Sequence, residues 1–160
     1  MSGAAVIVAL RVAATPLAAF TVFTRDIGRW WTSHPLFPLS PKGDGTLRFD
    51  PEGPGGRLVT RFADGEEWEI GAVRRWSPGE CLAFRWRLPS FAADQATEVE
   101  IRFEAVGDET RVTVEHRGWD AIPQRHAARH GFELMLFQQR LGEHWRQLLT
   151  RMGAISANID

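Results

Sequence analysis

Apolar and charged side chains alternate along residues 97–106. Val99, Ile101 and Phe103 fall on one side of an extended chain, and the acidic and basic residues between them fall on the other. Because successive side chains of a β-strand point to opposite faces, this pattern predicts a strand with one buried and one solvated face. The apolar face has to be covered by another element, and this requirement constrains the fold more than any other feature of the sequence.

A second apolar surface follows near the C-terminus. Apolar residues recur there every three or four positions, which is the period of one face of an α-helix. The stripe consists of Leu134, Phe137, Leu141, Trp145, Leu148 and Met152. We expect one long amphipathic helix that ends near Gly153, since glycine is a common C-terminal stop. This stripe is the natural cover for the apolar face of the strands.

The remaining segments predict strands and turns, with two short helices near the start. A β-branched run over residues 6–12 indicates a first strand, and Thr15 followed by Pro16 indicates a helix start. A second short helix is expected from Asp26. The later strands are expected at residues 46–49, 57–62, 68–76, 81–88, 97–106 and 111–116. Short turns between these strands force antiparallel neighbours.

Together these elements predict an α+β fold in the order β-α-α-β6-α, in which a curved antiparallel sheet wraps around the long C-terminal helix. The chain has 160 residues, which is the length of one ordinary domain. We therefore expect a single domain over residues 1–160.

Charge and composition argue against several partners. The formal net charge is −1, whereas nucleic-acid-binding proteins usually carry a basic excess. No apolar run is long enough to span a membrane, and residues 1–10 lack the basic start of a signal peptide, so no membrane insertion is expected. Cys81 is the only cysteine, which excludes an internal disulfide and fits a cytoplasmic location. No phosphate loop or dinucleotide motif is present, and no cofactor is predicted.

The order and spacing of several short segments resemble a known superfamily. They are Ala13–Pro16, Trp30–Trp31, Gly55–Arg57, Asp64–Glu66, Thr97–Glu104, Gly107–Val112, Glu115–Trp119 and Gly131–Phe132. On these segments the chain resembles the helix-grip fold of the START-like (SRPBCC) superfamily and, within it, the family related to the activator of Hsp90 ATPase (AHSA1-like). The resemblance implies a cavity between the sheet and the long helix that often holds an apolar small molecule. It implies no particular reaction.

The aromatic residues supply the predicted lining of that cavity. The chain has seven Trp and ten Phe but no Tyr, which provides large apolar surfaces and indole N–H donors. The candidate ligand-binding residues are Trp30, Trp31, Trp68, Phe84, Trp86, Phe103, His116, Trp119, Phe132, Leu136, Phe137 and Leu141. Trp30 and Trp31 either form a lid at the open end of the fold or fasten the short helices to the sheet. For each candidate, the alternative is a place in a solid core.

Three functions stay open on these residues. The first is binding of a hydrophobic or aromatic small molecule, which His116 and the indoles would orient. The second is an enzyme of the cyclase, dehydratase or hydrolase type, which needs His116 paired with Glu67, Glu69 or Asp120. The third, implied by the family name, is a module that acts on a chaperone through an outer face. A homodimer would require an exposed strand edge.

A histidine pair close to the start of the long helix is a further candidate, for metal binding. His126, His130 and Glu133 have a spacing that places three metal-binding side chains on one helix face, but no Glu directly follows the first His as in zinc-binding helices. We therefore predict a solvated helix start and no metal site. For His116, the simpler interpretation is a core histidine that is bonded to a neighbouring group.

Overall fold

The computed structural model follows the predicted order of elements. It describes residues 5–32, 34, 36–40, 45–87, 91–92, 95–123, 125–126, 129 and 131–157. Along the chain lie β1 (Val6–Val12), α1 (Pro16–Arg25), α2 (Ile27–Trp30), β2 (Thr46–Asp50), β3 (Arg57–Arg61), β4 (Glu67–Ser77), β5 (Cys81–Trp86), β6 (Thr97–Val106), β7 (Glu109–Arg117), the 3₁₀ turn η1 (Trp119–Ala121) and α3 (Leu134–Ser156). The predicted order is confirmed, with η1 as an addition. Within these ranges, no helix is both long and apolar enough to cross a membrane.

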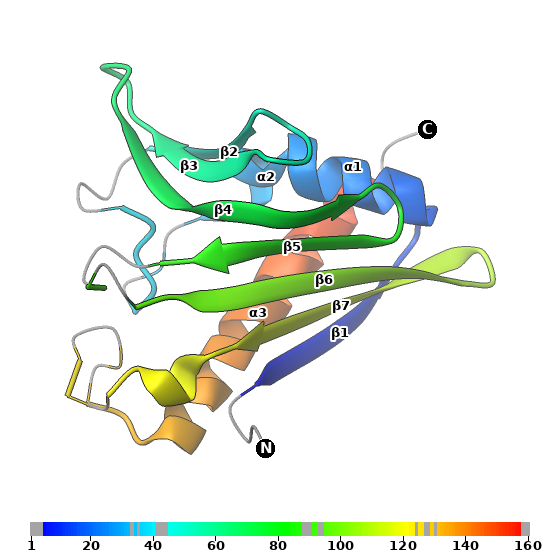
Figure 1. Cartoon of the computed structure of the whole chain (residues 1–160). Coiled ribbons are helices and arrows are strands. Elements are labelled where there is room, and N and C mark those ends of the chain that lie inside the picture. Colours follow the sequence, from blue (N-terminus) through cyan, green and yellow to red (C-terminus); the bar gives the residue numbers. More distant parts are fainter. Residues whose placement is uncertain are drawn as a thin grey trace.

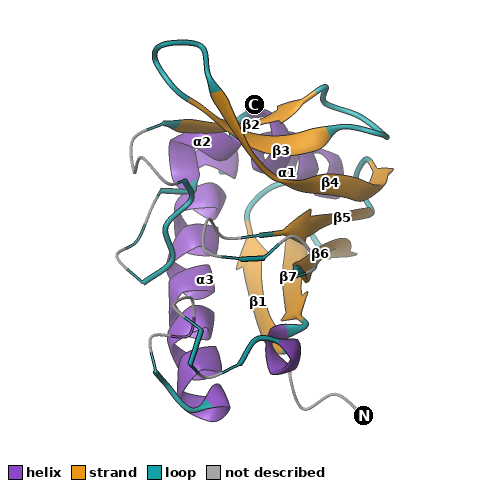
Figure 2. Ribbon diagram, turned by 60° about the vertical axis from the view of Figure 1, so that its left-hand side comes forward, coloured by secondary structure: helices purple, strands orange, loops and turns teal. Residues whose placement is uncertain are grey.

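The described strands form one antiparallel sheet in the order β1-β7-β6-β5-β4-β3-β2. The first strand of the chain pairs with the last one, from Val6 opposite His116 to Val12 opposite Thr110. The sheet curves, and α3 lies across one of its faces (Figures 1 and 2). β1 and β2 form the two edges, and pairing of either edge in a dimer stays a prediction.

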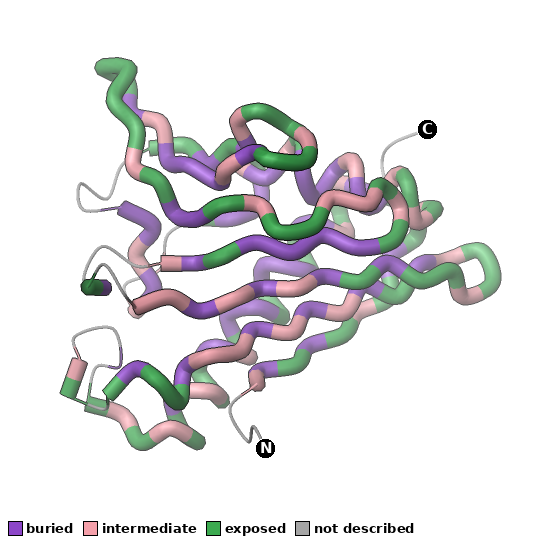
Figure 3. The backbone as a smooth tube through the Cα atoms, viewed as in Figure 1, coloured by how far each residue is buried: buried purple, intermediate pink, exposed green. Residues whose placement is uncertain are grey.

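The alternation along β6 sets which face of the sheet is buried. Val99, Ile101 and Phe103 are at most 4% exposed, whereas Arg102 and Glu104 face solvent. Figure 3 shows the same change between buried and less buried positions along β6 and β7. From α3, this face is covered by Phe137, Leu141, Trp145, Leu148 and Met152. The predicted packing of the helical stripe on the sheet is thus confirmed, with Leu134 only partly buried in the first turn.

The predicted stop of the long helix at Gly153 is wrong. α3 continues to Ser156, whose buried hydroxyl donates to the Met152 carbonyl at 3.0 Å. Gly153 serves instead for close approach to β1, since a Cβ at this position would lie 3.0 Å from Cγ1 of Val12. The start of α1 is as predicted, because the Thr15 hydroxyl accepts the Ala18 N–H at 3.1 Å. Strand β5 ends at Trp86, and the predicted end at Leu88 lies outside the described residues.

The sheet turns a corner at Gly71 in β4. Pairing with β3 runs up to Ala72 and pairing with β5 begins at Val73, and each ladder shifts its register close to this point, at Ile70 on the β3 side and at Arg74 on the β5 side. At this handover β5 passes so close that a side chain at Gly71 would collide with the Arg85 carbonyl oxygen. Figure 2 shows β2, β3 and the first part of β4 turned away from the remaining strands. The glycine therefore permits the bend that wraps the sheet around α3.

We expect Gly71→Ala to lower the free energy of unfolding by roughly 2–3 kcal/mol, because the added methyl group must displace the backbone of β5. Gly53→Ala is the matched control, since the space around Gly53 is open and the change should stay within about 0.5 kcal/mol. Urea denaturation followed by circular dichroism measures both. Equal stability of the two variants would contradict the role given to Gly71.

Candidate ligand-binding site

Six rings meet between the sheet and α3, and we call them the aromatic cluster. They are Trp31, Trp86, His116, Trp119, Phe137 and Trp145, and each is at most 3% exposed. Ring centroids lie 4.8 Å apart for Trp31 and Trp145, and 4.5 Å apart for Trp119 and Phe137. The members come from separate elements: Trp31 follows α2, Trp86 lies on β5, His116 on β7, Trp119 on η1, and Phe137 and Trp145 on α3. The cluster is thus created by the packing of helix on sheet.

A chain of hydrogen bonds crosses the cluster from α3 to the sheet. The Trp145 indole N–H donates to Nδ1 of His116 at 3.2 Å. Nδ1 is therefore an acceptor, so Nε2 carries the proton and donates to the Thr97 hydroxyl, 2.8 Å away. The Thr97 hydroxyl donates in turn to the Trp86 carbonyl at 2.9 Å. Both ring nitrogens of His116 are occupied, as the interpretation of a bonded core histidine predicts.

His116 is held as a neutral imidazole. Burial, assisted by the charge of Arg117, lowers its pKa to about 3. The acids proposed as its partners lie elsewhere. Glu67 and Glu69 pair with Arg57, and Asp120 is exposed on η1. Among the described residues, no acid–base pair forms around His116, so the geometry gives the enzyme hypothesis no support.

Several buried nitrogen atoms have no hydrogen-bond partner among the described residues. They are the indole nitrogens of Trp31, Trp68, Trp86 and Trp119, Nε of Arg129, and Nε2 of Gln138 and His144. Three of these indoles belong to the aromatic cluster. By contrast, the neighbouring Trp30 donates to the Val22 carbonyl at 3.4 Å, and Trp145 donates to His116. Buried polar groups are normally paired, so an unpaired group calls for an explanation such as water or a ligand.

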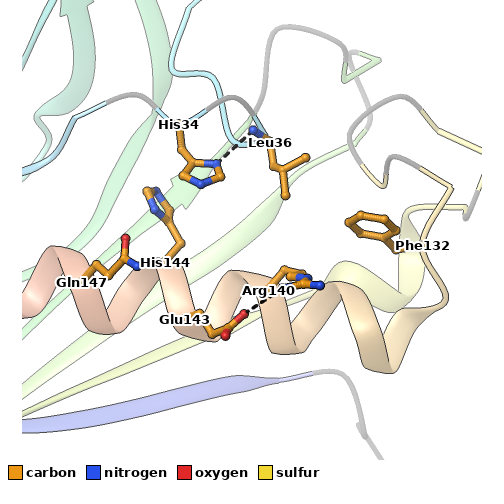
Figure 4. A pocket seen from close by; sticks show the side chains of 7 residues that line it. All are labelled: His34, Leu36, Phe132, Arg140, Glu143, His144 and Gln147. Atoms are coloured by element: carbon orange, nitrogen blue, oxygen red, sulfur yellow. Dashed lines mark hydrogen bonds and ion pairs between the residues drawn. The ribbon is translucent and has the colours of Figure 1, made fainter.

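A pocket lies beside the cluster, between the segment that contains His34 and the stretch of α3 from Arg140 to Gln147 (Figure 4). Its volume is about 490 Å³, and its lining residues are His34, Leu36, Phe132, Arg140, Glu143, His144 and Gln147. We call it the His34–His144 pocket, because the two imidazoles face each other with centroids 4.9 Å apart. The Leu36 N–H donates to Nδ1 of His34 at 3.0 Å, and Arg140 pairs with Glu143 at 3.5 Å.

The pocket and the aromatic cluster share a continuous set of rings. His144 is stacked on Phe37 at 5.0 Å, and Phe37 meets Phe137 of the cluster at 5.8 Å. Burial, with smaller contributions from His34 and Arg151, lowers the pKa of His144 to about 4, so this imidazole is neutral at pH 7. The Thr60 hydroxyl on β3 donates to the Leu39 carbonyl at 3.0 Å and fastens this side of the pocket to the sheet.

The candidates from the sequence lie in five places. Trp31, Trp86, His116, Trp119 and Phe137 form the cluster together with Trp145, while Trp30, Phe84, Phe103 and Leu141 pack around it in the core. Phe132 lines the pocket. Trp68 is partly buried on β4, and Leu136 is 40% exposed because the adjacent Phe137 takes the inward position on α3.

Trp30 and Trp31 are fastened into the core. They are stacked at 5.7 Å and are 0% and 3% exposed, which corresponds to the fastening role and not to a lid. The polar pocket residues on α3, above all His144, were missed, since they lie beside the apolar stripe and carry no motif. A signal was present: His144 follows Leu141 by three positions and so borders the inward face of the helix.

The histidine pair before α3 cannot be assessed as a pair, because His130 lies outside the described residues. His126 contacts Phe91, with ring centroids 5.4 Å apart. Within the described part of the chain, no group of three His, Cys, Asp or Glu side chains is arranged to hold a metal ion.

The curved sheet, the long helix and the site between them define a helix-grip domain. The family model described as activator of Hsp90 ATPase homolog 1-like protein matches residues 13–153. The chain therefore belongs to this family, which confirms the resemblance inferred from the sequence. A search of curated protein sequences found no match.

Solved structures share the fold at low sequence identity. Protein MLL2253 from Mesorhizobium loti has a TM-score of 0.65 at 16% identity, and the match covers 98% of each chain. The Hsp90 activator PFC0360w from Plasmodium falciparum has a TM-score of 0.64 at 16% identity, with 96% of each chain covered. The Aha1 dimer from Colwellia psychrerythraea has a TM-score of 0.63 at 16% identity, again with 96% of each chain covered. At such identities the likeness is one of fold.

The pKa of His116 predicts how stability depends on pH. Its value of about 3 lies below the ordinary 6.5, so between these limits the unfolded chain binds more protons than the folded one, and stability falls as the solution is acidified. At about pH 5 the loss from this one group is roughly 2 kcal/mol. His116→Gln offers an amide that still accepts and donates, and it should flatten the pH profile of the unfolding free energy.

Urea denaturation at a series of pH values measures this profile, and His126→Gln, which alters a histidine outside the cluster, is the control. A His116→Gln profile parallel to that of the unaltered protein would contradict the assignment.

Proposed function

We propose that the chain binds an apolar, aromatic small molecule in the His34–His144 pocket. The observation that carries this proposal is the pocket itself, where the ring of His144 is backed by the packed rings of Phe37 and Phe137. The pocket volume of about 490 Å³ is in the range of small-molecule sites. Family membership supports the proposal, because the resemblance to the helix-grip superfamily implies a binding space between sheet and helix.

The lining of the pocket supports an apolar ligand with a polar end. Leu36 and Phe132 offer apolar surface, whereas Arg140 and Gln147 bring polar groups from positions two turns apart on α3. Ligand pockets combine apolar walls with a few polar groups that fix orientation. His34 and His144 add flat rings on which an aromatic ligand can stack.

The test is a titration with Nile red, an uncharged aromatic dye that becomes fluorescent in apolar surroundings. We expect saturable binding to the unaltered protein. Leu36→Trp places a large ring in the pocket and should raise the dissociation constant at least tenfold. Met135→Trp is the matched control, because Met135 lies on α3 outside the lining of the pocket and is 82% exposed, so affinity should stay within twofold.

Absence of saturable binding to the unaltered protein would overturn the proposal. Equal affinity of the Leu36→Trp and Met135→Trp variants would show that the dye binds outside the pocket and would overturn the assignment of the site.

A second candidate function is action on an Hsp90-type ATPase. It is favoured by the family model over residues 13–153, and one structure with the same fold is described as an Hsp90 activator. This function would use an outer face, and the cytoplasmic location expected from the sequence suits such a partner. We expect the chain to raise the ATP turnover of a purified Hsp90-type ATPase, with Leu36→Trp as active as the unaltered protein because the pocket is not involved.

An unchanged rate of ATP hydrolysis over a range of chain concentrations that saturates any complex would remove this candidate. A stimulation that Leu36→Trp abolishes would instead link the chaperone to the pocket.

A further inference from the structure

The polar side of the His34–His144 pocket offers hydrogen-bond donors that lack acceptors. Nδ1 of His34 accepts the Leu36 N–H at 3.0 Å, so this nitrogen carries no proton and the proton of the neutral ring sits on Nε2. Among the described residues, this second N–H has no acceptor. Arg140, on the opposite wall, adds a guanidinium group, which can only donate. This side of the pocket therefore suits a group that accepts hydrogen bonds.

His144 adds an unsatisfied polar ring to the same wall. It is 7% exposed, it lines the pocket, and its side chain points from α3 toward His34 (Figure 4). Neither of its ring nitrogens has a hydrogen-bond partner among the described residues, and Nε2 is buried. No bond fixes its tautomer, so the neutral ring is able to present an N–H to an occupant of the pocket. A ligand that bonds this ring removes the cost of leaving it unpaired.

The charge around His144 is positive. Arg151 lies two turns further along α3, and its charge adds to the effect of burial in lowering the pKa of His144. Arg151 donates to the Thr32 hydroxyl at 2.7 Å, and no carboxylate pairs with it among the described residues. Arg140, one turn before His144, has a single acidic neighbour, Glu143, at 3.5 Å, and an exposed pair of this kind contributes little. Two arginines against one glutamate leave this side of the pocket with an excess of positive charge.

From these donors and this charge we infer the ligand class: a planar aromatic carboxylate, whose carboxylate group faces His34, His144 and Arg140. The inference rests on the proposed binding function and narrows it. An ionised carboxylate only accepts hydrogen bonds, and bonds to it are about twice as strong as bonds between neutral groups. The ring of such a molecule has the apolar surfaces of Leu36 and Phe132 to lie on. A neutral amide of the same shape would forgo the attraction between charges and would bring donors of its own.

The experiment compares 2-naphthoate with 2-naphthamide, an uncharged molecule of nearly the same shape, by displacement of Nile red at neutral pH. We expect naphthoate to bind roughly tenfold more tightly, which is the difference between charge-assisted and neutral hydrogen bonds. The ratio of the naphthamide to the naphthoate dissociation constant measures this preference. Raising the salt concentration to about 1 M should reduce the ratio, because salt screens the charges of partly exposed groups.

Charge variants on α3 place the carboxylate group. Arg140→Gln removes a cation from the pocket wall and should reduce the ratio several-fold. Glu143→Gln removes the competing carboxylate and should increase the ratio, a gain that damage to the fold does not produce. Arg146→Gln is the matched control, since it removes the same charge from the same helix at an exposed position outside the pocket lining. The control should keep the ratio of the unaltered protein.

The outcomes distinguish the ligand class from the binding function. Equal affinity of the unaltered protein for naphthoate and naphthamide, or failure of both to displace bound dye, would overturn the ligand class while the proposed function stands. This comparison needs no variant to fold. An equal change of the ratio in Arg140→Gln and Arg146→Gln would overturn the placement of the carboxylate in the pocket. Failure of the dye itself to bind would overturn the proposed function as well.

Discussion

The hydrogen-bond chain from Trp145 through His116 and Thr97 to the Trp86 carbonyl is the contact on which the interior depends. It is the polar link between α3 and the middle of the sheet, and it is fully buried. Each such bond contributes only about 1 kcal/mol net, but removing one partner leaves buried groups unpaired and costs more. The link therefore fixes where α3 sits along the sheet, and the apolar contacts around it provide most of the stabilisation.

The same interior combines tight apolar packing with unpaired donors. His116 is satisfied on both nitrogens, whereas the indoles on either side of it are not. This contrast separates the groups whose hydrogen bonds join α3 to the sheet from donors that lack a partner among the described residues. It also explains why a buried histidine here is structural: an imidazole whose two nitrogens are bonded, and whose charged form burial disfavours, has no free site for proton transfer.

The sequence predicts the fold well because the spacing of apolar residues within each segment identifies the face that is buried. The alternation around Ile101 and the stripe through Leu141 each identify one apolar face, and the two faces cover each other, with help from Phe20 and Phe23 of α1 over Phe103. The predicted helix end at Gly153 is wrong because this glycine permits close packing against Val12, a residue far away in the chain. Local signals say what a residue favours, and they do not say what packs against it.

The two parts of the candidate site differ in the same way, because local signals predict one of them and not the other. The rings of the aromatic cluster were predictable, since large apolar residues on inward positions must gather. The His34–His144 pocket was not, because its two imidazoles come from opposite ends of the chain and meet only once α3 is docked. Neither belongs to a motif, and His144 sits at the border of the stripe, where periodicity does not decide between core and surface.

The corner at Gly71 ties the shape of the sheet to the shape of the pocket. β4 carries both halves of the sheet, since its pairing with β3 ends where its pairing with β5 begins, and both ladders shift their register there. The Thr60–Leu39 hydrogen bond attaches the segment that contains His34 and Leu36 to β3, so the angle at which the β2–β3 hairpin leaves the rest of the sheet also sets where this side of the pocket stands relative to α3.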